Sequence, residues 1–243
     1  MNHASFKFSH EGELNNSIIY ILIAIILIFF IIEEYLGGSK NALTLLNLGA
    51  NSKELVLQKN QYYRLITSMY LHAGLMHLFF NCYVLYSFGN FLFSILGNKN
   101  FLLVFFISGI CGSLASVFLS KASISVGASG AIWGFLGATL ALSVFPSYYI
   151  ADYYRNILLK TTGINIAINL GISLLPMIDI WAHLGGGISG FILTWFIISE
   201  PKSYFRKTKH VIKNILLYIL LALNLICLTY VLFINLYTKY LNY

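Results

Sequence analysis

Long apolar runs, almost free of charge, recur along the whole chain and limit what it can fold into. A helix needs roughly 20 apolar residues to cross a hydrocarbon core about 30 Å thick, and the runs are close to that length. Of the 243 residues, 58% are hydrophobic and only 9% are charged, whereas a soluble domain is typically about a quarter charged. This composition excludes a water-soluble globular protein. It predicts an all-α polytopic membrane protein.

Seven apolar runs can be marked, and each predicts one membrane-spanning helix. The run over 18–32 is interpreted as a retained anchor rather than a signal peptide, because Glu33 and Glu34 follow it where a cleavage site needs small residues. The fifth run is the weakest, since polar residues such as Lys160 and Asn165 interrupt it, and we expect those groups to face protein or water. The predicted spans are 17–36, 71–90, 100–118, 127–145, 156–175, 179–199 and 212–237.

The distribution of Lys and Arg predicts the orientation of these spans. With a cytoplasmic N-terminus, nine basic residues lie on the inner side and six on the outer side, the bias that the positive-inside rule describes. We expect a short cytoplasmic N-terminus over 1–16, a membrane core over 17–199, and a basic cytoplasmic loop plus a seventh helix over 200–243. Residues 37–70 are expected to form short amphipathic helices and turns on the outer surface. The abundance of Ile, Asn and Lys is typical of an AT-rich bacterial genome, so the expected location is the bacterial plasma membrane.

Several functions are excluded by what the chain lacks. The net charge is +7, but no basic stripe is interleaved with aromatic residues, so nucleic acid is not an expected partner. Cys82, Cys111 and Cys227 fall within predicted spans and are interpreted as packing groups, without a disulfide framework or metal-ligand spacing. No H-E-x-x-H string is present, and Asp152 and Asp179 are predicted in a loop and at a span edge, which excludes zinc and aspartyl intramembrane proteases. No cofactor or metal is expected.

Polar side chains gather near the start of three predicted spans, where they are costly in lipid and usually functional. Ser129 lies at the start of the fourth span and His183 at the start of the sixth, while His77 and Asn81 lie one helical turn apart in the second. On the predicted orientation all three spans enter from the outer side, and a rise of 1.5 Å per residue places these side chains at similar depth. Three helices thus bring a hydroxyl, two imidazoles and an amide to one level.

This set of groups predicts serine-based hydrolysis of a peptide bond. A serine hydroxyl becomes a nucleophile when a neutral imidazole takes its proton, so Ser129 is the expected nucleophile and His183 the general base and later acid. The Asn81 amide, the His77 ring N–H and the Ser129 backbone N–H are the expected oxyanion donors. Because no acidic third member is available, we predict a Ser–His dyad. The imidazole would then be oriented by packing, and Trp133, one turn after Ser129, is placed to stack on it.

Glycines accompany both halves of the predicted dyad. Gly127 and Gly130 allow the chain to turn tightly and to approach a substrate closely at the start of the fourth span. Gly130 and Gly134 form a small-residue face on the fourth span, and Gly186 and Gly190 form one on the sixth. Small residues allow helices to approach closely in lipid, so we expect these two spans to pack together.

Five short motifs follow one another along the chain. They are Tyr63-Arg64, Leu71-His72-Ala73-Gly74, the His77 to Asn81 pair, Gly127-Ala128-Ser129-Gly130-Ala131, and Ala182-His183 followed by Gly186 and Gly190. In this order and spacing they resemble the rhomboid intramembrane serine proteases over about residues 45–200. The resemblance implies a rhomboid-like six-helix core, here with one additional C-terminal helix, and cleavage of transmembrane protein substrates in the lipid bilayer near the outer part of their spanning helices. It also implies that Ser129 and His183 form the dyad and that His77 and Asn81 serve the oxyanion.

The chain departs from the commonest rhomboid pattern at two positions. Tyr63 stands where Trp often precedes the arginine, and Trp133 stands where Tyr often stacks on the base. Both replacements are aromatic, so we expect tuning rather than inactivation. The resemblance further implies that the fifth span and residues 174–178 form a mobile helix and cap that admit substrate laterally, although a static helix facing a wet cavity would fit the same polar residues.

Two other functions remain open on the sequence alone. One is a catalytically silent rhomboid-like chaperone that binds transmembrane helices, and the other is a transporter. Transporters typically contain paired interrupted helices in two related halves, and no such internal repeat is present.

Overall fold

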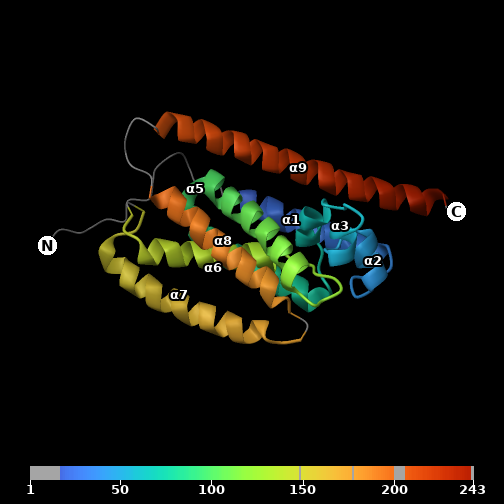
Figure 1. Cartoon of the computed structure of the whole chain (residues 1–243), viewed down its shortest axis with the longest axis horizontal. Coiled ribbons are helices and arrows are strands. Elements are labelled where there is room, and N and C mark those ends of the chain that lie inside the picture. The colour runs from blue at the N-terminus through green and yellow to red at the C-terminus, as the bar shows by residue number, and fades with distance from the viewer. Residues whose placement is uncertain (1–16, 148, 177, 200–205, 242–243) are drawn as a thin grey trace.

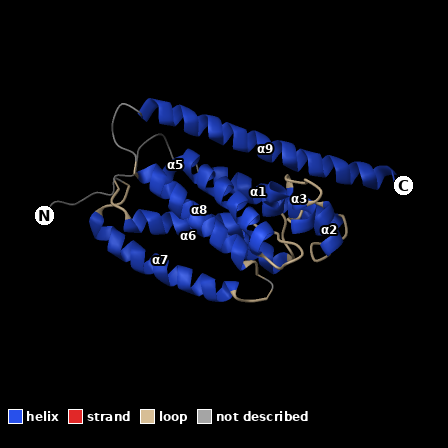
Figure 2. Cartoon of the chain, viewed as in Figure 1, coloured by secondary structure: helices blue, strands red, loops and turns tan. Residues whose placement is uncertain are grey.

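The structure, a computed structural model, describes residues 17–147, 149–176, 178–199 and 206–241. Within these ranges every regular element is helical (Figure 2), which confirms the all-α prediction. The predicted N-terminal segment 1–16 and residues 200–205 of the basic loop lie outside the described residues. The long helices are α1 (Ser17–Tyr35), α5 (Leu75–Leu119), α6 (Ser129–Val144), α7 (Asp152–Ser173), α8 (Ile180–Ile198) and α9 (Arg206–Leu241).

Helices α5, α6 and α8 pack together as the centre of the bundle, with α7 against α6 and with α1 and α9 against α5. In Figure 1, α9 and α7 lie at opposite edges of the molecule. Helix α6 is buried over most of its length. Phe101, Phe105 and Phe135 are completely buried, and the ring of Phe135 lies 5.0 Å from that of Phe101 and 6.1 Å from that of Phe105, which joins α6 to α5.

The spans predicted at 71–90 and 100–118 form one element, α5, in which the chain reverses direction at Gly97. This residue has φ 72° and ψ 171°, a conformation that glycine adopts without a Cβ penalty. A Cβ added to Gly89 would lie 3.6 Å from the ring of Phe101, whereas residues twelve apart in a straight helix are about 18 Å apart. The two halves of α5 are therefore antiparallel neighbours, joined by a connection shorter than expected.

Four of the described helices are long and apolar enough to cross a membrane: α1, α5, α8 and residues 211–237 of α9. Helix α6 is apolar but shorter. The protein is therefore an integral, multi-pass membrane protein. Helix α7 is less apolar, and its crossing stays a prediction. Lys160 is exposed, and Asn165 and Asn169 donate to carbonyls of their own helix. That these polar groups face protein or water stays a prediction.

Residues 37–70 form short helices and turns, as predicted. Arg64 holds this segment together: it is 5% exposed, and its Nη1 donates to the carbonyls of Leu46 and Ala50 at 2.7 and 2.9 Å. Burial lowers the pKa of Arg64, but a guanidinium remains charged at neutral pH, so these bonds are charge-assisted. The elements are α2 (Ala42–Asn47), α3 (Lys53–Leu57), α4 (Arg64–Thr67) and a 3-10 turn over Ser68–Tyr70.

Helix α9 is attached to the core and to the 37–70 segment. The Tyr70 hydroxyl donates to Asn224 Oδ1 at 2.7 Å in a buried position, and Asn235 Nδ2 donates to the Asn47 carbonyl at 2.9 Å. The helix begins at Arg206, six residues before the predicted start of the seventh span, so part of the expected loop is helical.

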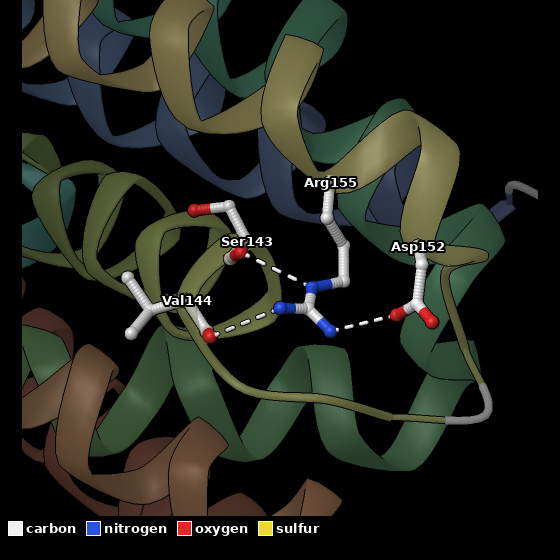
Figure 3. Close-up of polar contacts among 4 residues, drawn as sticks. All are labelled: Ser143, Val144, Asp152 and Arg155. Carbon is white, nitrogen blue, oxygen red and sulfur yellow. Dashed lines mark hydrogen bonds and ion pairs between the residues drawn. The ribbon is translucent and has the colours of Figure 1, made fainter.

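One end of α7 is fastened to the end of α6 by Arg155 (Figure 3). Its guanidinium donates to the carbonyls of Ser143 and Val144, both at 3.4 Å, and pairs with Asp152 at 2.8 Å. The last carbonyls of a helix lack partners within it, and a cation there is favourable. The N-terminal end of α7 is thereby tied to the C-terminal end of α6.

Candidate active site

Ser129 is the first residue of α6, and the chain reaches it through a turn at Gly127. This glycine has φ 118°, in the left-handed region that favours glycine, and its N–H donates to the Ser68 carbonyl at 2.9 Å. A Cβ at Gly127 would lie 2.7 Å from Cε1 and from Nε2 of His77. The tight turn is as predicted, and it presses the His77 ring against the segment that carries Ser129.

The backbone orients the ring of His77. The N–H of Ala73 donates to His77 Nδ1 at 3.3 Å, and a neutral imidazole carries only one N–H. The ring proton therefore lies on Nε2, an atom that faces the Gly127 turn. An oxyanion donor has to present its N–H toward the reacting centre in advance, and this role of His77 stays a prediction.

Asn81 lies one turn after His77 on α5 and is 6% exposed. Its Nδ2 donates to the His77 carbonyl at 2.8 Å, which leaves the second N–H of the amide for another acceptor. Among the described residues, Asn81 Oδ1 has no hydrogen-bond partner. The Asn81 amide is thus held close to His77, and one of its two N–H groups is already bonded within its own helix.

Glycines allow α6 and α8 to meet backbone to backbone. A Cβ on Gly186 would overlap the carbonyl of Gly130, and a Cβ on Gly190 would overlap the carbonyl of Gly134. The predicted packing of the two small-residue faces is therefore confirmed.

A third small-residue face, on the second half of α5, completes this contact and was not predicted. A Cβ on Gly112 would lie 2.6 Å from the carbonyl oxygen of Ala182, the residue before His183. Spacing of small residues by three or four positions is the signal that indicates such a face. These small residues are Gly109, Gly112, Ser113 and Ser116.

His183 lies in the first turn of α8 and stacks on Trp133. The two ring centroids are 5.2 Å apart and the planes differ by 19°, which confirms the predicted stacking. Because Trp133 is one turn after Ser129, the imidazole lies beside the face of α6 that carries Ser129. In the described part of the chain no hydrogen bond joins Ser129 to His183, and catalytic hydrogen bonds of this kind often form only with substrate bound.

The Nδ1 edge of the His183 ring contacts a residue that the sequence did not single out. Ser173 Oγ, at the end of α7, lies 2.7 Å from His183 Nδ1. The available signal was weak: Ser173 is four residues after Asn169 in the predicted span noted for its polar residues. The imidazole is therefore oriented by a hydrogen bond as well as by packing.

Asp179, the acidic residue nearest to His183 in the sequence, is committed elsewhere. Its Oδ1 accepts from the N–H groups of Trp181 and Ala182 at 3.2 Å, which caps α8, and its Oδ2 accepts from Ser116 Oγ. No hydrogen bond between Asp179 and the His183 ring is present in the described ranges. The carboxylate therefore stabilises the start of α8.

A cavity of about 870 Å³ opens beside His77. It lies between the end of α1 and the start of α5, and its lining includes Phe30, Glu34, Lys40 and Met76. In the described part of the chain, no cluster of three or more His, Cys, Asp or Glu could hold a metal ion. Of the predicted site residues, His77 is the one that lines this cavity.

The chain is similar to several known proteins. A family model described as the Rhomboid domain matches residues 59–200, more than half of the chain. The chain is 41% identical over 171 residues to RHOMBOID-like protein 6, mitochondrial, of Arabidopsis thaliana, which covers 70% of this chain and 54% of that protein. It is 40% identical over 177 residues to rhomboid protease GluP of Bacillus subtilis (strain 168), covering 71% and 33%.

A third relative, inactive RHOMBOID-like protein 8 of Arabidopsis thaliana, is 32% identical over 163 residues, with 67% of this chain and 46% of that protein covered. The chain spans between a third and just over half of the length of these relatives. Because the matched domain covers more than half of its length, the chain belongs to the rhomboid family.

Proposed function

We propose that this protein is an intramembrane serine endopeptidase that hydrolyses peptide bonds in or near the transmembrane segments of other membrane proteins. The proposal rests above all on one arrangement: Ser129 begins α6 beside α8, and His183 of α8 stacks on Trp133 of α6. The similarity to a relative named as a rhomboid protease supports it.

In the proposed reaction, His183 Nε2 takes the proton of Ser129 Oγ as this oxygen attacks the scissile carbonyl. The oxyanion accepts hydrogen bonds from the His77 ring and the Asn81 amide, and from the Ser129 N–H, one of the unpaired N–H groups at the start of α6. His183 then passes its proton to the leaving amine. Water hydrolyses the acyl-enzyme by the same steps, with His183 again as base.

The test uses the purified full-length protein in lipid nanodiscs. A fluorophosphonate should label the wild type, and a model transmembrane substrate with small and helix-breaking residues should be cleaved. Ser129→Ala and His183→Ala should abolish both signals. Ser143→Ala is the control, because Ser143 lies on the same helix and its hydroxyl donates only to the Leu140 carbonyl of that helix. Undiminished cleavage by Ser129→Ala would exclude this mechanism.

A membrane chaperone that binds transmembrane helices without cutting them is the alternative, since one relative is named inactive. In that case the wild type would retain intact substrate and would not be labelled by the fluorophosphonate. Labelling of Ser129 together with cleavage would exclude it.

We further propose that the N-terminus is cytoplasmic and that the site opens toward the outer face of a bacterial plasma membrane. The bias of basic residues supports this orientation. Lys40→Cys and Lys99→Cys, each in a chain without native cysteines, lie on opposite sides in this topology. A membrane-impermeant maleimide added to intact cells should label Lys40→Cys alone, and labelling of Lys99→Cys alone would reverse the orientation.

We also propose that α7 and residues 174–178, of which residue 177 lies outside the described residues, admit substrate laterally. In its favour, Thr162 and Ser173 are the only buried residues along α7. Distances between spin labels on the first half of α5 and on α7 should increase with substrate. An unchanged distance would count against this gating.

A further inference from the structure

The ring of His183 is contacted from α7 by one buried hydroxyl, that of Ser173. Ser173 is 2% exposed and His183 is 8% exposed. Ser173 Oγ lies 2.7 Å from His183 Nδ1 and also 2.7 Å from the carbonyl oxygen of Asn169, four residues earlier in α7. The hydroxyl is therefore placed between a ring nitrogen and a backbone carbonyl.

The direction of both hydrogen bonds follows from counting protons. A serine hydroxyl has one proton to donate, and a carbonyl oxygen can only accept. The contact with Asn169 therefore uses the proton of Ser173, and the contact with His183 then requires a proton on Nδ1. Because a neutral imidazole carries one N–H, Nε2 of His183 is left with its lone pair free.

This tautomer is the one that a general base needs. In Ser-His-Asp enzymes, a carboxylate bonded to Nδ1 keeps the imidazole in the tautomer whose Nε2 accepts the serine proton. Here the carboxylate of Asp179 is occupied by the start of α8 and by Ser116. Trp133 restrains the plane of the imidazole through stacking, whereas Ser173 restrains rotation within that plane.

We propose that Ser173 is a positioning residue that holds His183 in its Nδ1–H tautomer, so that Nε2 is available as the base toward Ser129. The catalytic effect of this tautomer rests on the proposed peptidase function, but the tautomer itself can be measured without any turnover.

The first experiment is ¹⁵N NMR of the full-length protein labelled at histidine in nanodiscs at neutral pH, with the His183 signals identified by their loss in His183→Ala. We expect wild-type shifts of an Nδ1–H, Nε2-unprotonated ring, and a mixture of the two tautomers in Ser173→Ala. An Nε2–H ring in the wild type, or the same tautomer in both proteins, would overturn the proposal.

The second experiment separates kcat from KM for cleavage of the model transmembrane substrate. Ser173→Ala should lower kcat by about 2- to 12-fold, the range for loss of one neutral hydrogen bond, with KM unchanged. Ser173→Thr should restore kcat, because a threonine hydroxyl can also bond to the carbonyl four residues earlier. Ser143→Ala, which removes only a hydrogen bond within its own helix, should keep the wild-type kcat.

The outcomes distinguish the two proposals. If the wild type cleaves no substrate, the proposed function fails while the NMR result still decides the tautomer. If the wild type cleaves normally and Ser173→Ala keeps both its kcat and its tautomer, the positioning role fails while the peptidase stands. A loss of kcat in Ser173→Ala that Ser173→Thr does not restore would also refute the positioning role.

Discussion

The imidazole of His183 lies nearly parallel to the indole of Trp133, with the ring centroids 5.2 Å apart. This contact crosses from α8 to α6 at the level where Ser129 begins α6. The stacking geometry depends on the close approach of the two helices. This approach requires glycine at position 186, because a Cβ there would overlap the Gly130 carbonyl. The position of the expected base thus follows from the packing of α6 against α8.

Removing the indole should impair turnover. Stacking of two aromatic rings contributes about 0.5–1.5 kcal/mol beyond area burial, so Trp133→Ala should lower kcat by about 2- to 12-fold. Trp133→Tyr should retain most of the wild-type kcat because it preserves a ring at this position. Thermal unfolding of each variant separates lost positioning from lost fold. Wild-type kcat in a folded Trp133→Ala protein would show that the stack does not orient the base.

Loss of an oxyanion donor should reduce turnover without unfolding the protein. Removing one such donor typically costs about 10²–10³ in kcat, and we expect losses of this size for Asn81→Ala and for His77→Ala. Asn100→Ala is the control for Asn81→Ala, because Asn100 makes the same kind of bond to a carbonyl four residues earlier, at 3.0 Å. Wild-type turnover in both Asn81→Ala and His77→Ala would refute their assignment.

A methyl group at the contact between α6 and α8 should destabilise the bundle. In Gly186→Ala the new Cβ would overlap the Gly130 carbonyl, and overpacking of this kind costs about 1–3 kcal/mol. Gly171→Ala is the matched control on α7, since its Cβ would meet nothing within 4 Å and alanine favours a helix over glycine by up to about 1 kcal/mol. In mixed micelles, Gly186→Ala should therefore have a lower free energy of unfolding than Gly171→Ala. Equal free energies of unfolding would contradict the packing of α6 against α8.

Acid should weaken the fold through His72, which lies before α5. This side chain is completely buried, and its burial together with the nearby His77 lowers the pKa of His72 from 6.5 to about 3. An unfolded chain binds a proton at this histidine below pH 6.5, whereas the folded chain does not until about pH 3. Stability should be full above pH 6.5 and decrease at lower pH by about 1.4 kcal/mol per pH unit.

The comparison of His72→Gln with the wild type isolates this contribution from other titrating groups. Between pH 7.5 and 4.5, the wild type should lose about 3 kcal/mol more stability than the variant, given the same cost per pH unit. The measurement is the thermal unfolding midpoint of both proteins across this range. Parallel pH profiles would show that His72 is not held neutral by the fold.

Most of the secondary structure could be predicted because hydropathy is a local property of the chain. An apolar run of about 20 residues forms a helix in lipid because its backbone groups can be satisfied only within the segment. The positions of α1, α6, α8 and most of α9 therefore follow from the sequence. The boundaries that differ have local causes. Gly74 has φ 100°, and α5 begins after it at Leu75 instead of at residue 71. Gly97 lies between two predicted spans, and the chain reverses direction there without a separate loop.

Some residues of the candidate site could likewise be predicted from the sequence, whereas others required the structure. Ser129, His183, His77 and Asn81 could be named because polar groups at the start of apolar helices are rare and costly. The sequence alone therefore determined that this is a helical membrane protein with a rhomboid set of motifs. The tertiary structure alone decided that Ser173 meets His183 Nδ1 and that Asp179 is occupied by Ser116. Such contacts depend on the rotation and register of one helix against another, which no single segment of the chain encodes.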